Sequence, residues 1–222
     1  MGRVDFRVGT VNRLIPMNGT SLGRQSRSVV GLLIVTLLSV SAPAAQDLVL
    51  QVDQARSATK FALGASLHTV HGTFQIKKGA LRASLDSAKF SGEIAVDATS
   101  GESGSGMRDR KMHKEVLESE RYREIIFRPD RIDGTVIAPG KSSVKVHGIF
   151  SVHGSDHELT IPADVDIGLD NWSANAHFTI PYVKWGIKNP STLFLRVSDE
   201  VELDVVMAGT LTRETPANRP AQ

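Results

Sequence analysis

Apolar and polar residues alternate along several stretches of the chain, and this period of two residues limits the possible folds more than any other feature. The alternation is clearest at residues 91–98, 144–153, 161–167 and 200–207. Successive side chains of a β-strand point to opposite faces, so these stretches are typical of antiparallel strands with one buried face. Shorter runs predict further strands near residues 47–53, 57–66, 72–77, 80–86, 124–128, 131–138 and 172–181.

Turn residues separate the predicted strands. They lie at Lys78-Gly79, Asp133-Gly134, Pro139-Gly140, residues 154–156 and Asp170-Asn171. Many short strands at this spacing indicate a sandwich or a closed barrel. One segment differs: after a flexible linker at residues 101–106, residues 107–120 place Met112, Val116 and Leu117 together on a charged helix. We therefore expect an all-β fold with one short α-helix.

The N-terminus has the pattern of a secretory signal peptide. Arg24 and Arg27 precede an uncharged apolar run at residues 29–40, and small residues follow at 42–44. As a helix the run would be about 18 Å long, too short for a bilayer core of about 30 Å. We expect residues 1–44 to be the signal peptide, with Met17 as an alternative start, residues 45–212 to form one domain, and residues 213–222 to be a flexible tail.

The charge balance and the motifs exclude several classes of function. The whole chain has a formal net charge of +2, and residues 1–44 contribute +4 of it. A mature chain without these residues would therefore have a net charge of −2 and would lack the basic surface that nucleic acids require. The chain has no cysteine, no G-x-S-x-G elbow and no phosphate-binding loop. Residues 157–161 begin like a zinc-protease helix, but Ile161 stands where the second histidine must be.

The charged and titratable residues are expected on the surface. By alternation, His147, His153 and His177 fall on the polar faces of their strands, so neither a metal nor another cofactor is predicted. The basic residues at 108–114 are neutralised by neighbouring acids, which favours a solvated helix face. Contact with an anionic head group is the alternative.

Small residues are frequent on the predicted inner face. They are Ala65, Gly92, Ala98, Gly148, Ala163, Ala174 and Ala176. Small interior residues either let strands coil tightly or leave a void, and the sequence leaves both possibilities open.

Four blocks, in order, resemble the YceI-like family of lipid- and polyisoprenoid-binding proteins. The first is Ala58–Phe61 with Val70–Phe74, similar to the family's V-x-G-x-F. The second is Arg108-Asp109 followed by Tyr122 and Ile126-Phe127. The third is Val146–Gly154, similar to V-x-G-x-L-x-I-H-G. The fourth is Ile180–Ile187 with Ser198–Leu203. The resemblance covers nearly all of residues 46–211.

The resemblance implies a lipocalin-like antiparallel β-barrel of about eight strands around a hydrophobic tunnel. Its ligand would be an isoprenoid or another lipid-like amphiphile, held by a carrier or sequestering protein in the bacterial periplasm or outside the cell, without catalysis. The predicted tunnel lining is Phe61, Leu63, Phe74, Ile94, Val96, Phe127, Val146, Phe150, Ile161, Phe178 and Trp185, with Met112 and Leu117 closing the helix end.

Two other functions stay open at this point. One is a structural or interaction barrel with a filled core, and the other is a hydrolase that uses a histidine at the barrel mouth. The sequence also leaves open a homodimer and transient contact with a membrane.

Overall fold

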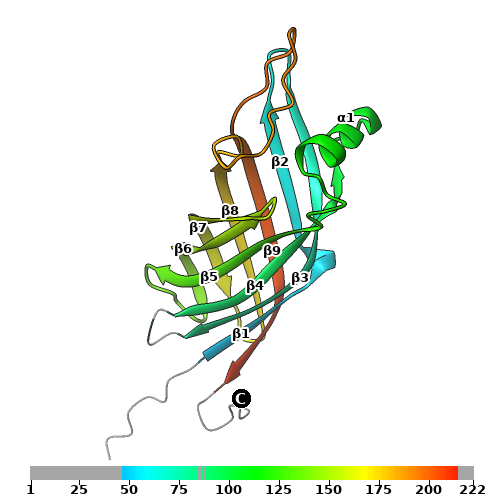
Figure 1. Cartoon of the computed structure of the whole chain (residues 1–222). Coiled ribbons are helices and arrows are strands. Elements are labelled where there is room, and N and C mark those ends of the chain that lie inside the picture. Colours follow the sequence, from blue (N-terminus) through cyan, green and yellow to red (C-terminus); the bar gives the residue numbers. More distant parts are fainter. Residues whose placement is uncertain (1–46, 85–86, 88, 215–222) are drawn as a thin grey trace, which may run out of the picture. The chain divides into compact units, whose positions relative to one another are not determined.

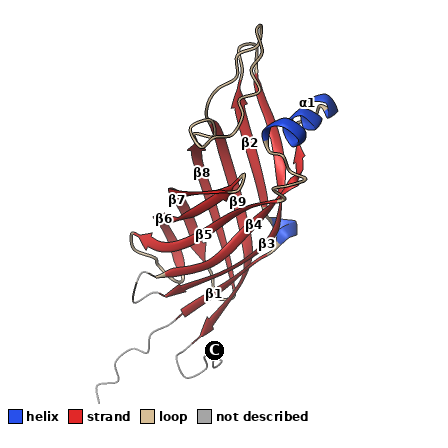
Figure 2. Ribbon diagram, viewed as in Figure 1, coloured by secondary structure: helices blue, strands red, loops and turns tan. Residues whose placement is uncertain are grey.

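The computed structural model describes residues 47–84, 87 and 89–214, and the predicted signal peptide lies outside them. Strands make up most of this part of the chain (Figures 1 and 2). The strands are β1 (Asp47–Val52), β2 (Ala58–Gly64), β3 (Thr69–Ser84), β4 (Phe90–Glu102), β5 (Glu124–Asp133), β6 (Gly140–Val152), β7 (Ser155–Ile167), β8 (Asn171–Ile180) and β9 (Val201–Glu214). The helical segments are η1 (Gln54–Arg56), α1 (Gly106–Lys111) and the π-helical turn η2 (Met112–Val116).

The strands form one antiparallel sheet that closes on itself. The order is β1-β3-β2-β9-β8-β7-β6-β5-β4, and pairings of β3 with β4 and of β1 with β9 complete the ring. Strands β1 and β2 lie end to end between β3 and β9. Strand β1 pairs with residues 80–84 of β3 and 209–214 of β9, and β2 pairs with residues 69–74 and 202–206. The nine strands therefore occupy eight positions, which confirms the predicted lipocalin-like barrel of about eight strands.

A short 3₁₀ turn separates β1 from β2. Asp53 caps it, because its Oδ1 accepts a hydrogen bond from the backbone N of Ala55 at 3.0 Å. The second carboxylate oxygen of Asp53 accepts from Arg56 at 2.7 Å. Asp side chains favour such local bonds over a strand ladder, which explains why one long strand is interrupted here.

Two β-bulges replace breaks that the sequence predicts. Residues 72–77 and 80–86 were expected as two strands joined by a turn at Lys78-Gly79, but β3 continues through them with a register shift between Ile76 and Lys78. Similarly, β5 runs through Pro129 with a shift before Arg131 and ends at Asp133, so the strand predicted at 131–138 is mostly wrong. A bulge adds one unpaired residue and bends the strand, as a curved barrel wall requires.

The helical segment is shorter than predicted. It spans residues 106–116 rather than 107–120, and Gly101 and Glu102 of the expected linker belong to β4. Glu118 has a φ of 46°, which is incompatible with a continuing right-handed helix. The ring of His113 ties the segment to the barrel, because its Nε2 lies 2.9 Å from the carbonyl oxygen of Gly101. None of the helices among the described residues has the length and apolar character needed to cross a bilayer.

Buried side chains form two clusters, one toward each end of the barrel. The cluster near the β1 end includes Leu48, Leu81, Trp172 and Leu211. The cluster near α1 includes Phe61, Phe150, Tyr182 and Leu203, with Met112 and Val116 packed against it. We call the two ends of the barrel the Trp172 end and the α1 end, after these clusters. Residues of both clusters line the cavity described below. Strand β9 extends through Glu214, two residues into the predicted tail.

Candidate functional site: an apolar cavity inside the barrel

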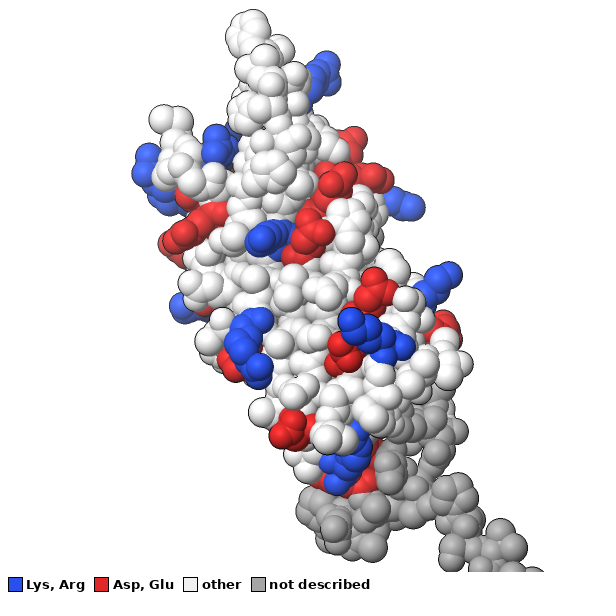
Figure 3. Space-filling view, turned by 180° about the vertical axis from the view of Figure 1, so that it is seen from behind, with Lys and Arg blue, Asp and Glu red and all other residues white. Residues whose placement is uncertain are grey.

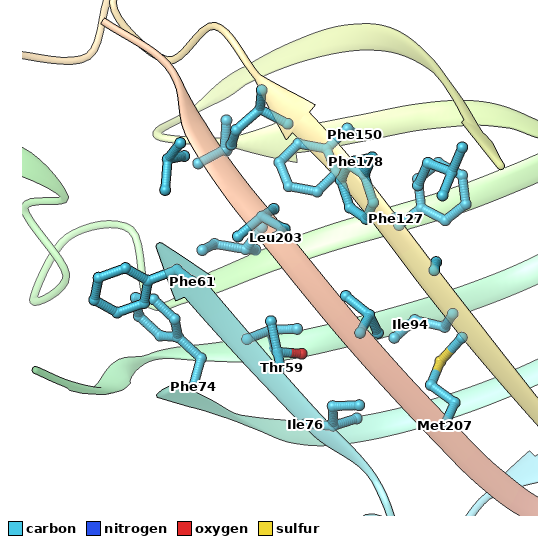
Figure 4. Close-up of a pocket in the computed structure, with 18 of the residues that line it drawn as sticks. Thr59, Phe61, Phe74, Ile76, Ile94, Phe127, Phe150, Phe178, Leu203 and Met207 are labelled. Atoms are coloured by element: carbon cyan, nitrogen blue, oxygen red, sulfur yellow. The ribbon is translucent and has the colours of Figure 1, made fainter. Parts of the chain in front are cut away.

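The barrel interior holds a cavity of about 540 Å³. Inward-facing side chains of all nine strands line it, from Leu48 and Trp172 at one end to Tyr182 and Ile187 at the other. Figure 4 shows Phe127, Phe150 and Phe178 on one side of it and Phe61 and Phe74 on another. Its volume is within the range of about 300–1,000 Å³ that small-molecule sites occupy. The lining contains no carboxylate among the described residues.

The inward face that alternation predicts is the face that lines the cavity. The predicted residues that line the cavity are Phe61, Leu63, Phe74, Ile94, Val96, Phe127, Val146, Phe150, Ile161 and Phe178 from the strands, Met112 from the helical segment, and Leu117 directly after it. Their placement follows from the pairing register, which sets Val146 opposite Ile161 and Ile94 opposite Phe127. That these side chains contact a ligand stays a prediction.

Trp185 was expected in the lining and lies outside it. It belongs to a turn after β8, in which the backbone N of Ile187 donates to the carbonyl oxygen of Tyr182 at 3.1 Å. The indole stacks on the His157 ring with centroids 4.2 Å apart and packs against Phe150 at 5.7 Å. A period of two does not continue through a turn, so alternation could not assign the direction of this side chain.

Tyr182 and Ile187 line the cavity at the α1 end, and the sequence analysis missed both. Tyr182 is buried and its hydroxyl donates to the carbonyl oxygen of Ser198 at 2.7 Å. Burial, and secondarily the charge of Asp199, raises the pKa of Tyr182 to about 12, so the phenol stays neutral. The sequence signal for these two residues is their place in the block Ile180–Ile187, which resembles the family but has no period of two residues.

Six of the seven small residues predicted on the inner face divide into two groups, whereas Ala98 is buried but does not line the cavity. Ala65, Ala163, Ala174 and Ala176 line the cavity, so their small size leaves space. At Gly92 and Gly148 a Cβ would overlap the carbonyl oxygens of Ala80 and Arg128, so these glycines allow neighbouring strands to approach closely. Both possibilities left open by the sequence are therefore realised, at different positions.

Thr59 adds an unpaired polar atom to the apolar wall, and the sequence analysis did not single it out. It is 6% exposed, lines the cavity, and its Oγ1 has no hydrogen-bond partner among the described residues (Figure 4). Its position follows from alternation, because Thr59, Phe61 and Leu63 share one face of β2. A buried hydroxyl without a partner costs about 1–3 kcal/mol.

We predict that Thr59→Val raises the free energy of unfolding of the ligand-free protein by about 1 kcal/mol, because it removes this unpaired hydroxyl at nearly constant volume. Urea denaturation measures the change. Thr73→Val is the matched control, since Thr73 is exposed on the adjacent strand and its replacement should change stability little. A less stable Thr59→Val protein would mean that the hydroxyl has a partner in solution.

Two cationic side chains, Arg108 and Lys111, lie at the α1 end of the cavity. Arg108 donates to the carbonyl oxygen of Ser103 at 2.9 Å, and the Nζ of Lys111 donates to the carbonyl oxygen of Pro190 at 3.0 Å. Neither is within ion-pair distance of a carboxylate in the described part of the chain. The cavity is thus apolar along its length and cationic at one end.

The histidines lie almost entirely outside the cavity. His68 alone of the seven lines it. His147 and His177 instead pair on the outer surface with Asp130 at 2.8 Å and Asp204 at 2.6 Å. No group of His, Asp or Glu among the described residues could hold a metal ion. The hydrogen bonds and ion pairs of histidine side chains among the described residues belong to His113, His147, His153 and His177, so His68 has no hydrogen-bonded nucleophile or carboxylate there.

Comparison with known proteins agrees with this architecture. Solved structures that share the fold include BcnA from Burkholderia cenocepacia, with 20% identity, a TM-score of 0.58, and coverage of 72% of this chain and 99% of that one. A polyisoprenoid-binding domain from Saccharophagus degradans has 14% identity and a TM-score of 0.54, over 78% of this chain and 100% of that one. The YceI protein of Campylobacter jejuni has 15% identity and a TM-score of 0.52, over 65% and 86%.

A family model identifies the chain more directly than these structures do. Among curated proteins, none matches the chain significantly. The model of the YceI-like domain matches residues 50–208, a range that includes most of the barrel and the cavity described above. The chain therefore belongs to the YceI-like family.

Proposed function

We propose that this protein is an exported carrier that holds a long apolar ligand, a polyisoprenoid or a similar amphiphile, inside the barrel. The observation that carries the proposal is a cavity with an apolar wall along the whole barrel. Each buried CH₂ group contributes about 0.8 kcal/mol, so a long chain can bind tightly without specific polar contacts. The polar end of the ligand would lie beside Arg108 and Lys111.

Two further observations support this proposal. The signal-peptide pattern of residues 1–44 favours export to the periplasm or out of the cell, where a hydrophobic ligand needs protection from water. The domain from Saccharophagus degradans that shares the fold is described as polyisoprenoid-binding. An open cavity argues against a purely structural barrel with a filled core, and a lining without carboxylates argues against a hydrolase.

The direct test is native mass spectrometry of the mature protein isolated from the periplasm. We expect co-purified lipid-like molecules that are released by organic extraction. A protein that carries no such molecule and binds none after extraction would contradict the proposal.

We predict that affinity rises with ligand chain length by up to about 0.8 kcal/mol per CH₂ and then levels off when the cavity is full. Trp172 lines the cavity and Trp185 does not, so a Trp185→Phe protein has a single tryptophan that reports on binding. Titrations with saturated alcohols of increasing length should show affinity that rises and then levels off, and calorimetry should show a negative heat-capacity change on binding. Affinity independent of chain length would exclude an apolar tunnel as the source of binding.

A further inference from the structure

The α1 end of the barrel carries a projecting apolar tip. It is formed by the β2–β3 turn, residues 65–68, and by the loop at residues 191–197, which lie together at the top of Figure 1. Ala65 and Val197 form an isolated β-bridge, and the backbone N of Ser66 donates to the carbonyl oxygen of Arg196 at 2.9 Å. Within the loop, the backbone N of Thr192 donates to the carbonyl oxygen of Leu195 at 2.9 Å.

Large apolar side chains are fully exposed at this tip. Leu193 and Phe194 are each 94% exposed and Leu67 is 83% exposed. Met107, at the start of the neighbouring α1, is also exposed. Clustered exposed apolar side chains on a soluble domain mark an interaction site.

Arg196 is the one charged residue of the apolar tip, and other charges lie beside the tip. Residues 64–69 and 191–195 contain no Lys, Arg, Asp or Glu, and the tip is the mostly white projection at the top of Figure 3, with a basic side chain on its flank. Exposed cations lie here: Arg196 belongs to the loop itself, and Arg108, Arg110 and Lys114 belong to the helical segment, which also carries Asp109 and Glu115. That segment contacts the base of the loop through the bond from Lys111 to Pro190. Apolar side chains followed by cations are typical of segments that enter a lipid interface.

The tip is also continuous with the cavity. Ala65, His68, Thr192, Leu195 and Val197 line the cavity from the same turn and loop that expose Leu67, Leu193 and Phe194 to solvent. One surface of this structure therefore faces the ligand site while the other faces outward. A ligand that passes along it would not have to cross bulk water.

We propose that the apolar tip inserts into the interfacial layer of a lipid bilayer, with anionic lipids facing the adjacent cations, and that the cavity exchanges its ligand there. The tip's role in exchange rests on the proposed carrier function, whereas its binding to a bilayer does not. A second copy of the chain is a poorer occupant, because three side chains on a narrow projection supply far less than the roughly 1,200 Å² that a stable protein interface buries.

The test is sedimentation of the mature protein with two kinds of vesicle, phosphatidylcholine alone and phosphatidylcholine mixed with phosphatidylglycerol. We expect binding to the mixed vesicles that weakens with salt. The double variant Leu193→Ser/Phe194→Ser should lose at least about tenfold in binding, since both apolar anchors are removed. Leu169→Ser is the matched control: Leu169 is 76% exposed in the β7–β8 turn near the Trp172 end, and the variant should bind like the wild type.

A second readout separates the tip from the cavity. The double variant should keep its affinity for a monomeric alcohol delivered from solution, yet accept ligand from vesicles at least about tenfold more slowly. Equal vesicle binding by the double variant and the wild type would overturn the proposal, as would a wild type that binds neither vesicle. Light scattering that shows a wild-type dimer and a monomeric double variant would instead assign the tip to self-association. Failure to bind any alcohol, with vesicle binding intact, would contradict the carrier function alone.

Discussion

Replacing Phe150 with Asp is expected to lower the free energy of unfolding by several kcal/mol. Phe150 is 7% exposed, lines the cavity and packs against Trp185. The carboxylate would lie in an apolar wall in which His157, opposite it on β7, is the polar side chain at the same register position, and burial of a charge in such a wall is among the most destabilising of single changes. Urea denaturation monitored by circular dichroism measures the loss, and a protein that no longer folds is the extreme of the same result.

His147→Ala provides the contrast for that experiment. His147 is on the same strand, β6, but on its outer face, where Nδ1 lies 2.8 Å from Oδ1 of the exposed Asp130. Loss of such a surface pair costs about 0–1 kcal/mol. If His147→Ala proved as damaging as Phe150→Asp, the inward and outward faces of β6 would have to be exchanged.

Replacing Ala176 with Phe is expected to weaken the binding of long chains without loss of stability. Ala176 and its cross-strand partner Ala163 both line the cavity, so a larger side chain at this point occupies free space. We expect affinity to fall by at least about tenfold, equivalent to about 1.4 kcal/mol, and the melting temperature to stay the same or rise. Calorimetric titration and thermal unfolding measure the two effects.

Two further substitutions make that result specific. Asn175→Phe places the same side chain on the exposed face of β8 and should leave binding unchanged. Gly148→Leu should instead destabilise the protein by about 1–3 kcal/mol, because its Cβ would overlap the backbone of β5. A destabilised Ala176→Phe protein that resembles Gly148→Leu would indicate a filled core and contradict the cavity.

Alternation predicted the strands of the barrel wall and which of their side chains face inward. A strand with one buried face specifies its own orientation, because a shift of one residue would expose every apolar side chain. Val146, Phe150 and Ile161 could therefore be assigned to the interior from their spacing, and the structure places all of them there. Thr59 obeys the same rule and was passed over only because its side chain is polar.

The tertiary structure alone decided the features that the alternation of apolar and polar residues cannot predict. Trp185 is in a turn, and its direction depends on His157, which is distant in sequence. Gly148 and Ala176 are both small residues of the inner face. The backbone of β5 approaches Gly148 closely, whereas Ala176 borders the free space of the cavity, and only the distances between strands decide this difference. The apolar tip likewise exists because residues 65–68 and 191–197, far apart in the chain, pair at one end of the barrel. The sequence by itself determined which face of each strand is apolar, since that is a property of neighbours along the chain. The space that those faces enclose depends on distances between strands, which only the closed sheet sets.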